Sequence, residues 1–184
     1  MAGASDGDTI TVAAGTCTWD EGLVITKAVS IIGAGIGETV INNAYAPSLS
    51  GGTLDPAKHL IAIVPASPEM NPTIRLSGLT FNFGTTSYGI YYGNDSTTYD
   101  CTNVRLDHLR ISASSYVLQR YGLAHGVMDN CIIEGAMDGG GSEALWTTNG
   151  YEFGTASNFY IEDSVWSAHP DTSAIGHAGN GALR

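Results

Sequence analysis

Basic residues are scarce in this chain of 184 residues. Only 7 lysines and arginines stand against 18 acidic residues, which gives a formal net charge of −11. Such a field repels a polyanion, and no basic cluster offsets it, so the composition argues against nucleic-acid binding. No run approaches the about 20 consecutive apolar residues of a membrane-spanning helix, so we expect no membrane partner.

Cysteine is also sparse, and its arrangement excludes several kinds of site. The three cysteines, Cys17, Cys101 and Cys131, have no Cys-x-x-Cys spacing and cannot all pair with one another. Their odd number leaves the redox compartment open. Cys131 lies within a repeated apolar phrase, which favours a small buried thiol over a reactive one.

The first residues lack the features of a secretion signal. The segment 1–8 has neither the basic start nor the apolar core of such a signal. We therefore expect either export by another route or a segment taken from a longer precursor.

A strand-like phrase recurs four times in the second half of the chain. The phrases begin at Arg75, Arg105, Val127 and Tyr160, at spacings of 30, 22 and 33 residues, and align without a gap: RLSGLTF, RLDHLRI, VMDNCII and YIEDSVW. Repeats of this kind cannot bury their own apolar faces and must stack. The alignment predicts one inward column of Leu76, Leu106, Met128 and Ile161, with Leu79, Leu109 and Cys131 near it.

The rest of the chain has the same character. Residues 8–19, 23–26, 28–32, 39–41 and 59–64 read as short strands, and their connections are too short for helical crossovers. The 24 glycines and the charged fraction of only 14% favour tight turns and strands over surface helices. The sequence thus predicts one all-β domain over 1–184, a parallel β-solenoid with loop excursions near 44–58, 84–102 and 134–157.

The N-terminal run carries a family resemblance. Residues 7–16, GDTITVAAGT, and residues 23–41, LVITKAVSIIGAGIGETVI, resemble the opening of right-handed parallel β-helix proteins of the pectate-lyase-like superfamily. The later Asp107-His108 and Asp129-Asn130 phrases resemble coils of the same group. This resemblance implies the fold and an extracellular, cell-surface or virion-surface location. The superfamily includes lyases, hydrolases, epimerases, phage tailspikes and adhesins, so it does not fix an activity.

Two features depart from that family pattern. We find no calcium-binding aspartate cluster followed by an Arg-x-Pro-x-x-Arg segment, as the lyases have. The final residues, 179–184, read as the start of another strand, which we expect to pair with the strand containing Phe159 to Ile161 or its neighbour. The sequence therefore predicts an incomplete C-terminal end that associates with another copy or continues into further coils.

Stacked coils would place equivalent residues about 4.8 Å apart in outward columns. One column is Ser77, Asp107, Asp129 and Glu162; the next is Gly78, His108, Asn130 and Asp163. The three carboxylates could share a calcium ion, or two could act as an acid/base pair at roughly 5 to 9.5 Å on a glycosidic bond. Arg105 would then serve as the base or the carboxylate anchor of a uronate-cleaving lyase. The alternative, which we favour, is that Asp and Asn cap the corners of the coil.

Aromatic residues suggest contact with sugar rings. Tyr91, Tyr92, Trp146 and Trp166 fall in or beside predicted loops and strand ends, and His169 lies in a loop that could reach a groove. Exposed aromatic faces stack on sugars, whereas packing beneath the loops would be purely structural. The sequence predicts a carbohydrate-active protein that binds or cleaves a polysaccharide. The alternative is a non-catalytic structural or adhesive module of a cell surface or virion spike.

Overall fold

The structure is a computed structural model that describes residues 3–50, 55–65, 73–84, 87–93, 101–121, 124–138, 159–167, 175–176 and 181–183. This part of the chain is all-β, and its one helical element is the 3-10 turn η1 (Pro56–Lys58). No helix among the described residues is long and apolar enough to cross a membrane. The strands are β1 (Thr9–Thr11), β2 (Gly15–Trp19), β3 (Leu23–Ile25), β4 (Ser30–Ile32), β5 (Thr39–Asn43), β6 (His59–Ile63), β7 (Ile74–Gly84), β8 (Tyr88–Gly93), β9 (Cys101–Tyr121), β10 (Ala124–Asp129), β11 (Ile132–Asp138), β12 (Phe159–Glu162), β13 (Val165–Ser167), β14 (Ile175–Gly176) and β15 (Gly181–Leu183).

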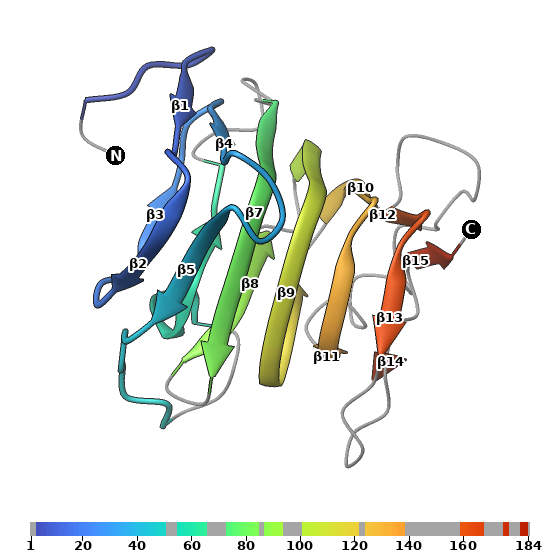
Figure 1. Cartoon of the computed structure of the whole chain (residues 1–184). Coiled ribbons are helices and arrows are strands. Elements are labelled where there is room, and N and C mark those ends of the chain that lie inside the picture. The colour runs from blue at the N-terminus through green and yellow to red at the C-terminus, as the bar shows by residue number, and fades with distance from the viewer. Residues whose placement is uncertain are drawn as a thin grey trace.

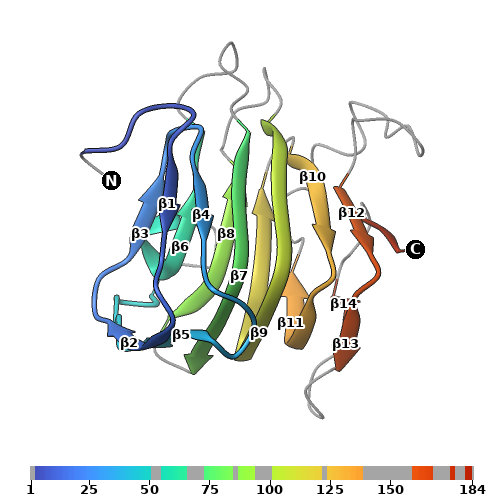
Figure 2. The same cartoon turned by 45° about the horizontal axis from the view of Figure 1, so that its top comes forward.

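The strands form three parallel stacks that the chain visits in turn (Figures 1 and 2). The first stack runs β1-β4-β7-β9-β10-β12-β15. The second contains β2, β5, β7, β9, β11 and β13, and the third contains β3, β6, β8, β9, β11 and β14. The long strands β7, β9 and β11 bend through more than one stack, so they tie the stacks together.

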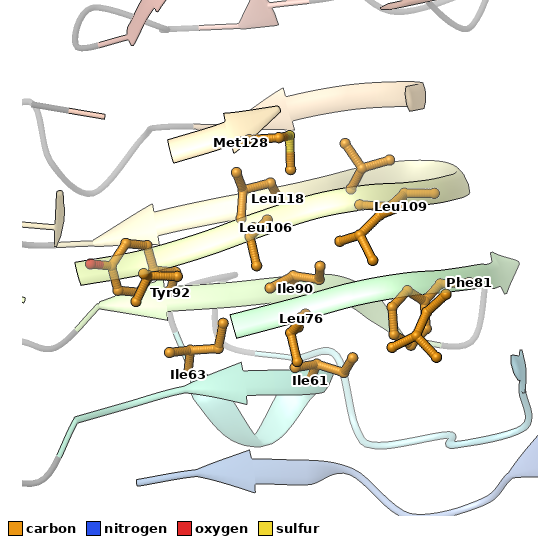
Figure 3. Packing of buried hydrophobic residues seen from close by; sticks show 14 of the residues in the cluster. Ile61, Ile63, Leu76, Phe81, Ile90, Tyr92, Leu106, Leu109, Leu118 and Met128 are labelled. Atoms are coloured by element: carbon orange, nitrogen blue, oxygen red, sulfur yellow. The ribbon is translucent and has the colours of Figure 1, made fainter. Parts of the chain in front are cut away.

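The predicted inward column is confirmed. The strand register places Leu76 beside Leu106, Leu106 beside Met128, and Met128 beside Ile161, and all four side chains are buried. Figure 3 shows Leu76, Leu106 and Met128 in one packed cluster with side chains of the third stack, such as Ile61 and Ile90. Apolar side chains thus fill the space that the three stacks enclose.

Cys131 is buried in this core, as its place in the repeat predicts. Burial raises the pKa of its thiol to about 12, so it stays protonated at neutral pH and behaves as a small apolar side chain. Cys17 is a free, exposed cysteine in β2, beside Ile41 of β5.

The segments with predicted loop excursions are described only in part, so the excursions themselves stay predictions. Residues 44–50, in the first segment, contain no strand. The second, 84–102, contains the strand β8 and the start of β9. The third is placed too early, because β11 continues to Asp138 along the edge that the 21-residue strand β9 offers it. The remainder of that excursion lies outside the described residues.

The predicted pairing of the last strand is confirmed. Strand β15 lies parallel to β12, with Gly181 beside Phe159 and Leu183 beside Ile161. This pairing extends the first stack by one strand. Self-association and further coils stay predictions.

Candidate functional site

The predicted column of one serine and three carboxylates is present on the first stack. The register joins its members in the order Ser77, Asp107, Asp129 and Glu162. The row two residues earlier in each strand is Arg75, Arg105, Val127 and Tyr160. Residues two apart in a strand point to the same side, so guanidinium and carboxylate groups gather on one surface.

Asp107 is the centre of this surface. Its side chain is fully buried, and its two oxygens accept hydrogen bonds from Nε and Nη2 of Arg75 at 2.6 and 2.7 Å. Ser77 Oγ donates to Oδ2 at 2.8 Å, and His108 Nδ1 lies 2.9 Å from the same oxygen. Burial alone would raise the pKa of Asp107. The hydrogen bonds from Arg75, His108 and Ser77 outweigh it and hold the pKa well below its usual range.

The same contact repeats on the next strand. Arg105 donates from Nε and Nη2 to the two oxygens of Asp129 at 3.2 and 2.9 Å, and its Nε lies 3.6 Å from Asp107. Each arginine therefore reaches diagonally to the aspartate of the following strand. We call Arg75, Asp107, Arg105 and Asp129 the arginine–aspartate ladder.

The residue that follows each ladder aspartate in the chain also contacts its carboxylate. Asn130 Nδ2 donates to Asp129 Oδ2 at 2.9 Å, the distance that also separates His108 Nδ1 from Asp107 Oδ2. His108 and Asn130 have φ of +51° and +53°, the left-handed conformation in which a strand can turn a corner. The left-handed corner residues are therefore His108 and Asn130, each beside the aspartate before it, and corner capping by the aspartates themselves stays a prediction.

The first member of the corner row must be glycine. Gly78 has φ of +68°, and a Cβ there would lie 2.8 Å from the carbonyl oxygen of Gly33, the residue that follows β4. A Cβ on Gly33 would lie 2.2 Å from the carbonyl oxygen of Gly78. The two backbones approach too closely at this corner for any side chain.

The positively and negatively charged groups of the ladder differ in solvent exposure. The side chains of Arg75, Arg105 and His108 are 41%, 51% and 59% exposed, whereas those of Asp107 and Asp129 are 0% and 11% exposed. The hydrogen-bond donors thus form the outer layer, and the carboxylates lie beneath them. We call the exposed groups of Arg75, Arg105, His108 and Asn130 the donor face.

Glu162 shares the row but falls outside the repeating pattern. Val127 occupies the register position at which a third arginine would reach towards Glu162. Glu162 is half-buried, and it is followed by Asp163, another left-handed corner residue with φ of +46°. The three carboxylates that the sequence groups together therefore lie in two different environments.

The two tyrosines of β8 are buried, unlike the exposed aromatic faces that the sequence predicts. Tyr91 and Tyr92 are 2% and 0% exposed, so the expectation that their faces are open to a sugar is wrong. Tyr91 packs against the ring of His59, and Tyr92 donates from its hydroxyl to the carbonyl oxygen of His125. Trp166 is half-buried and donates from Nε1 to the carbonyl oxygen of Gly135 at 3.0 Å. Trp146 and His169 lie outside the described residues.

Calcium binding by Asp107, Asp129 and Glu162 stays a prediction. Among the described residues, no three His, Cys, Asp or Glu side chains are grouped closely enough to hold a metal ion. A cation at this row would also have to displace Arg75 or Arg105 from its carboxylate.

A melting experiment tests calcium binding directly. If the row holds the ion, calcium should raise the melting temperature and the Asp129→Asn variant should abolish that rise. A melting temperature that neither calcium nor a chelator changes would leave Asp107 and Asp129 as ladder and corner residues only.

The sequence did not predict a functional role for two hydrogen-bond donors of this surface. Arg75 and His108 were recognised only as members of columns, because nothing in the sequence gives the diagonal reach from one strand to the next. The signal was an arginine at the same position of two aligned phrases, Arg75 and Arg105, read together with the parallel register.

Comparisons of this chain with models of protein families, with curated proteins and with solved structures found no match.

Proposed function

We propose that this chain is a right-handed parallel β-helix of the pectate-lyase-like type that binds a polysaccharide on its donor face without cleaving it. The three parallel stacks and the enclosed apolar column support the β-helix. The N-terminal resemblance described above supports the superfamily and a surface or extracellular location.

The depth-ordered charges of the ladder carry the proposal of binding. Arg75 and Arg105 lie side by side in the register, and the carboxylates beneath fix their guanidinium groups. Sugar hydroxyl and carboxylate oxygens are hydrogen-bond acceptors, and a planar guanidinium offers several N–H donors in a fixed geometry. Pre-ordered donors lose little side-chain entropy when a ligand binds.

The same contacts argue against an acid/base role for the ladder aspartates. A general acid or base works best when its pKa lies near the operating pH, whereas hydrogen bonds hold the pKa of Asp107 far below it. Both oxygens of Asp107 and of Asp129 already accept hydrogen bonds from arginine. The carboxylate of Asp107 therefore stays ionised, and both aspartates orient the guanidinium groups that they contact.

A structural or adhesive module is the second candidate function. The observation in its favour is the unbroken buried column from Leu76 to Ile161. A rigid rod needs only stacked strands around such a column. It differs from the first proposal in needing no ligand on the donor face.

Arg105→Gln is the decisive variant for polysaccharide binding. It removes one exposed guanidinium of the donor face, and we expect roughly tenfold weaker binding, because a hydrogen bond to a charged group contributes about 1.5–3 kcal/mol. Affinity electrophoresis against a panel of neutral and acidic polysaccharides measures the change. Products of lyase and hydrolase action are measured in the same mixtures, and we expect none.

Arg110→Gln is the matched control. Arg110 lies on the same strand, is 46% exposed and pairs with Glu134 at 3.0 Å, but it belongs to the second stack. We expect it to bind as the parent does. Equal losses in both variants would contradict the donor face, and absence of binding by the parent would favour the structural module. Release of sugar products by the parent, lost in Arg105→Gln, would show an enzyme instead.

A further inference from the structure

The arginine–aspartate ladder has no net formal charge. Arg75 Nε lies 2.6 Å from a carboxylate oxygen of Asp107, and Arg105 Nη2 lies 2.9 Å from one of Asp129. At such distances each carboxylate largely cancels the charge of its guanidinium for a ligand that lies farther away. His108 counts as neutral in the formal charge of the chain. The donor face therefore offers directed N–H groups with little positive potential.

The surface beside the ladder is acidic. The row of Asp129 continues into Glu162 on the adjacent strand, and the exposed corner residue Asp163 follows. Adjacent strands lie about 4.8 Å apart, which is less than the screening length of about 8 Å at physiological salt. An anionic ligand lying along the row would thus be repelled by these carboxylates, and the net charge of −11 on the chain adds to the repulsion.

The row of arginines continues into two side chains with apolar surface. Val127 lies beside Arg105 in the register, and Tyr160 lies beside Val127. Both are half-buried, and both lie on the outward side, because the next residues of their strands, Met128 and Ile161, face the core. A sugar ring has apolar C–H groups and hydroxyl groups, so it can contact an aromatic side chain and also accept hydrogen bonds from a guanidinium.

We propose that the ligand of the donor face is an uncharged polysaccharide. Its hydroxyl groups accept hydrogen bonds from Arg75 and Arg105, and a neighbouring ring lies against Val127 and Tyr160. This inference rests on the proposed function and narrows its ligand class. A neutral sugar needs donors in a fixed geometry but no net charge, which is what the ladder provides. The carboxylates of an acidic polysaccharide would compete with the ladder aspartates for the same N–H groups.

Pairs of polysaccharides that differ in charge test this inference. The probes are dextran with carboxymethyl dextran, hydroxyethyl cellulose with carboxymethyl cellulose, and methyl-esterified with de-esterified polygalacturonan. We expect at least one uncharged probe to bind, and to bind roughly tenfold or more tighter than its acidic partner in titration calorimetry at about 50 mM salt. The gap should narrow at about 500 mM salt, because salt screens the repulsion.

Asp163→Asn tests whether the acidic surroundings act locally. It removes an exposed charge and keeps a residue type that tolerates the φ of +46°. We expect the affinity for the acidic probe, relative to its uncharged partner, to rise several-fold. Asp20→Asn makes the same change at an exposed position between β2 and β3, away from the donor face, and should leave this ratio unchanged. An equal rise in both variants, or no rise in Asp163→Asn, would overturn the local effect.

Tyr160→Ala and Tyr160→Phe test the ring contact. We expect the uncharged probe to bind several-fold more weakly to Tyr160→Ala and normally to Tyr160→Phe, and parent-like binding by Tyr160→Ala would overturn the contact. An acidic probe that binds the parent as tightly as its uncharged partner, and is lost in Arg105→Gln, would overturn the ligand class while the proposed function stands. Binding of none of the six probes would refute the proposed function and this inference with it.

Discussion

Leu106→Asp is expected to unfold the chain. Leu106 lies at the centre of the first stack, between Leu76 and Met128, and it is completely buried. A buried carboxylate without a partner costs several kcal/mol, which is comparable with the total stability of about 5–15 kcal/mol of a typical domain. Circular dichroism and urea denaturation should show loss of the cooperative transition.

Two further variants separate charge from packing at this position. Leu106→Ala should leave a folded but weaker protein, destabilised by about 2–5 kcal/mol through the cavity it creates. Thr16→Asp introduces the same charge at an exposed position of β2 and should change stability little. A cooperative, parent-like transition in Leu106→Asp would show that the inward column is assigned wrongly.

Asp107→Asn is expected to destabilise the chain by about 2 kcal/mol at neutral pH, because it removes the ionic acceptor shared by Arg75, Ser77 and His108. The folded-state pKa of Asp107 lies below its unfolded value, so its contribution is fully present above about pH 4. As the pH falls below that value the unfolded chain takes up a proton first, and the contribution is lost. The difference between parent and variant in urea denaturation should therefore shrink in acid.

Glu134→Gln is the matched control for this pH dependence. Glu134 also pairs with an arginine through a 3.0 Å contact, but its side chain is 36% exposed. An exposed pair contributes about 0–1 kcal/mol, so this variant should lie close to the parent at every pH. A loss in Glu134→Gln as large as that in Asp107→Asn would refute the claim that burial makes the ladder strong. A difference for Asp107→Asn that does not depend on pH would refute the assignment of its ionised state.

The ladder stabilises the stack and shapes the donor face at the same time. If the ladder is broken at Asp107, Arg75 loses the partner that fixes its guanidinium, so stability and ligand binding should weaken together. Arg105→Gln leaves the contacts of Asp107 with Arg75, Ser77 and His108 in place and removes only the contact with the less buried Asp129, so it should weaken binding more than stability.

The sequence by itself determined the all-β class, the inward column and the register of the second half. Four gapless phrases sufficed for this, because a shift by one residue would turn Leu106 and Met128 out of the core. The same alignment placed Ser77, Asp107, Asp129 and Glu162 in one row and predicted the pairing of the last strand.

Only the tertiary structure decided which side chains of those rows contact one another and which are exposed. The diagonal from Arg75 to Asp107 joins residues 32 positions apart, and which groups lie outermost depends on side-chain depth, which a column of letters does not contain. Tyr91 and Tyr92 were misjudged for the same reason. Neighbouring residues of a strand point to opposite sides, and both sides of β8 are buried at these two positions. His59 gave no sequence signal, since its partners Asp55, Tyr88 and Gln119 come together only when three segments stack. Local pattern thus fixed which residues align, and long-range packing fixed their burial, their charge partners and their chemistry.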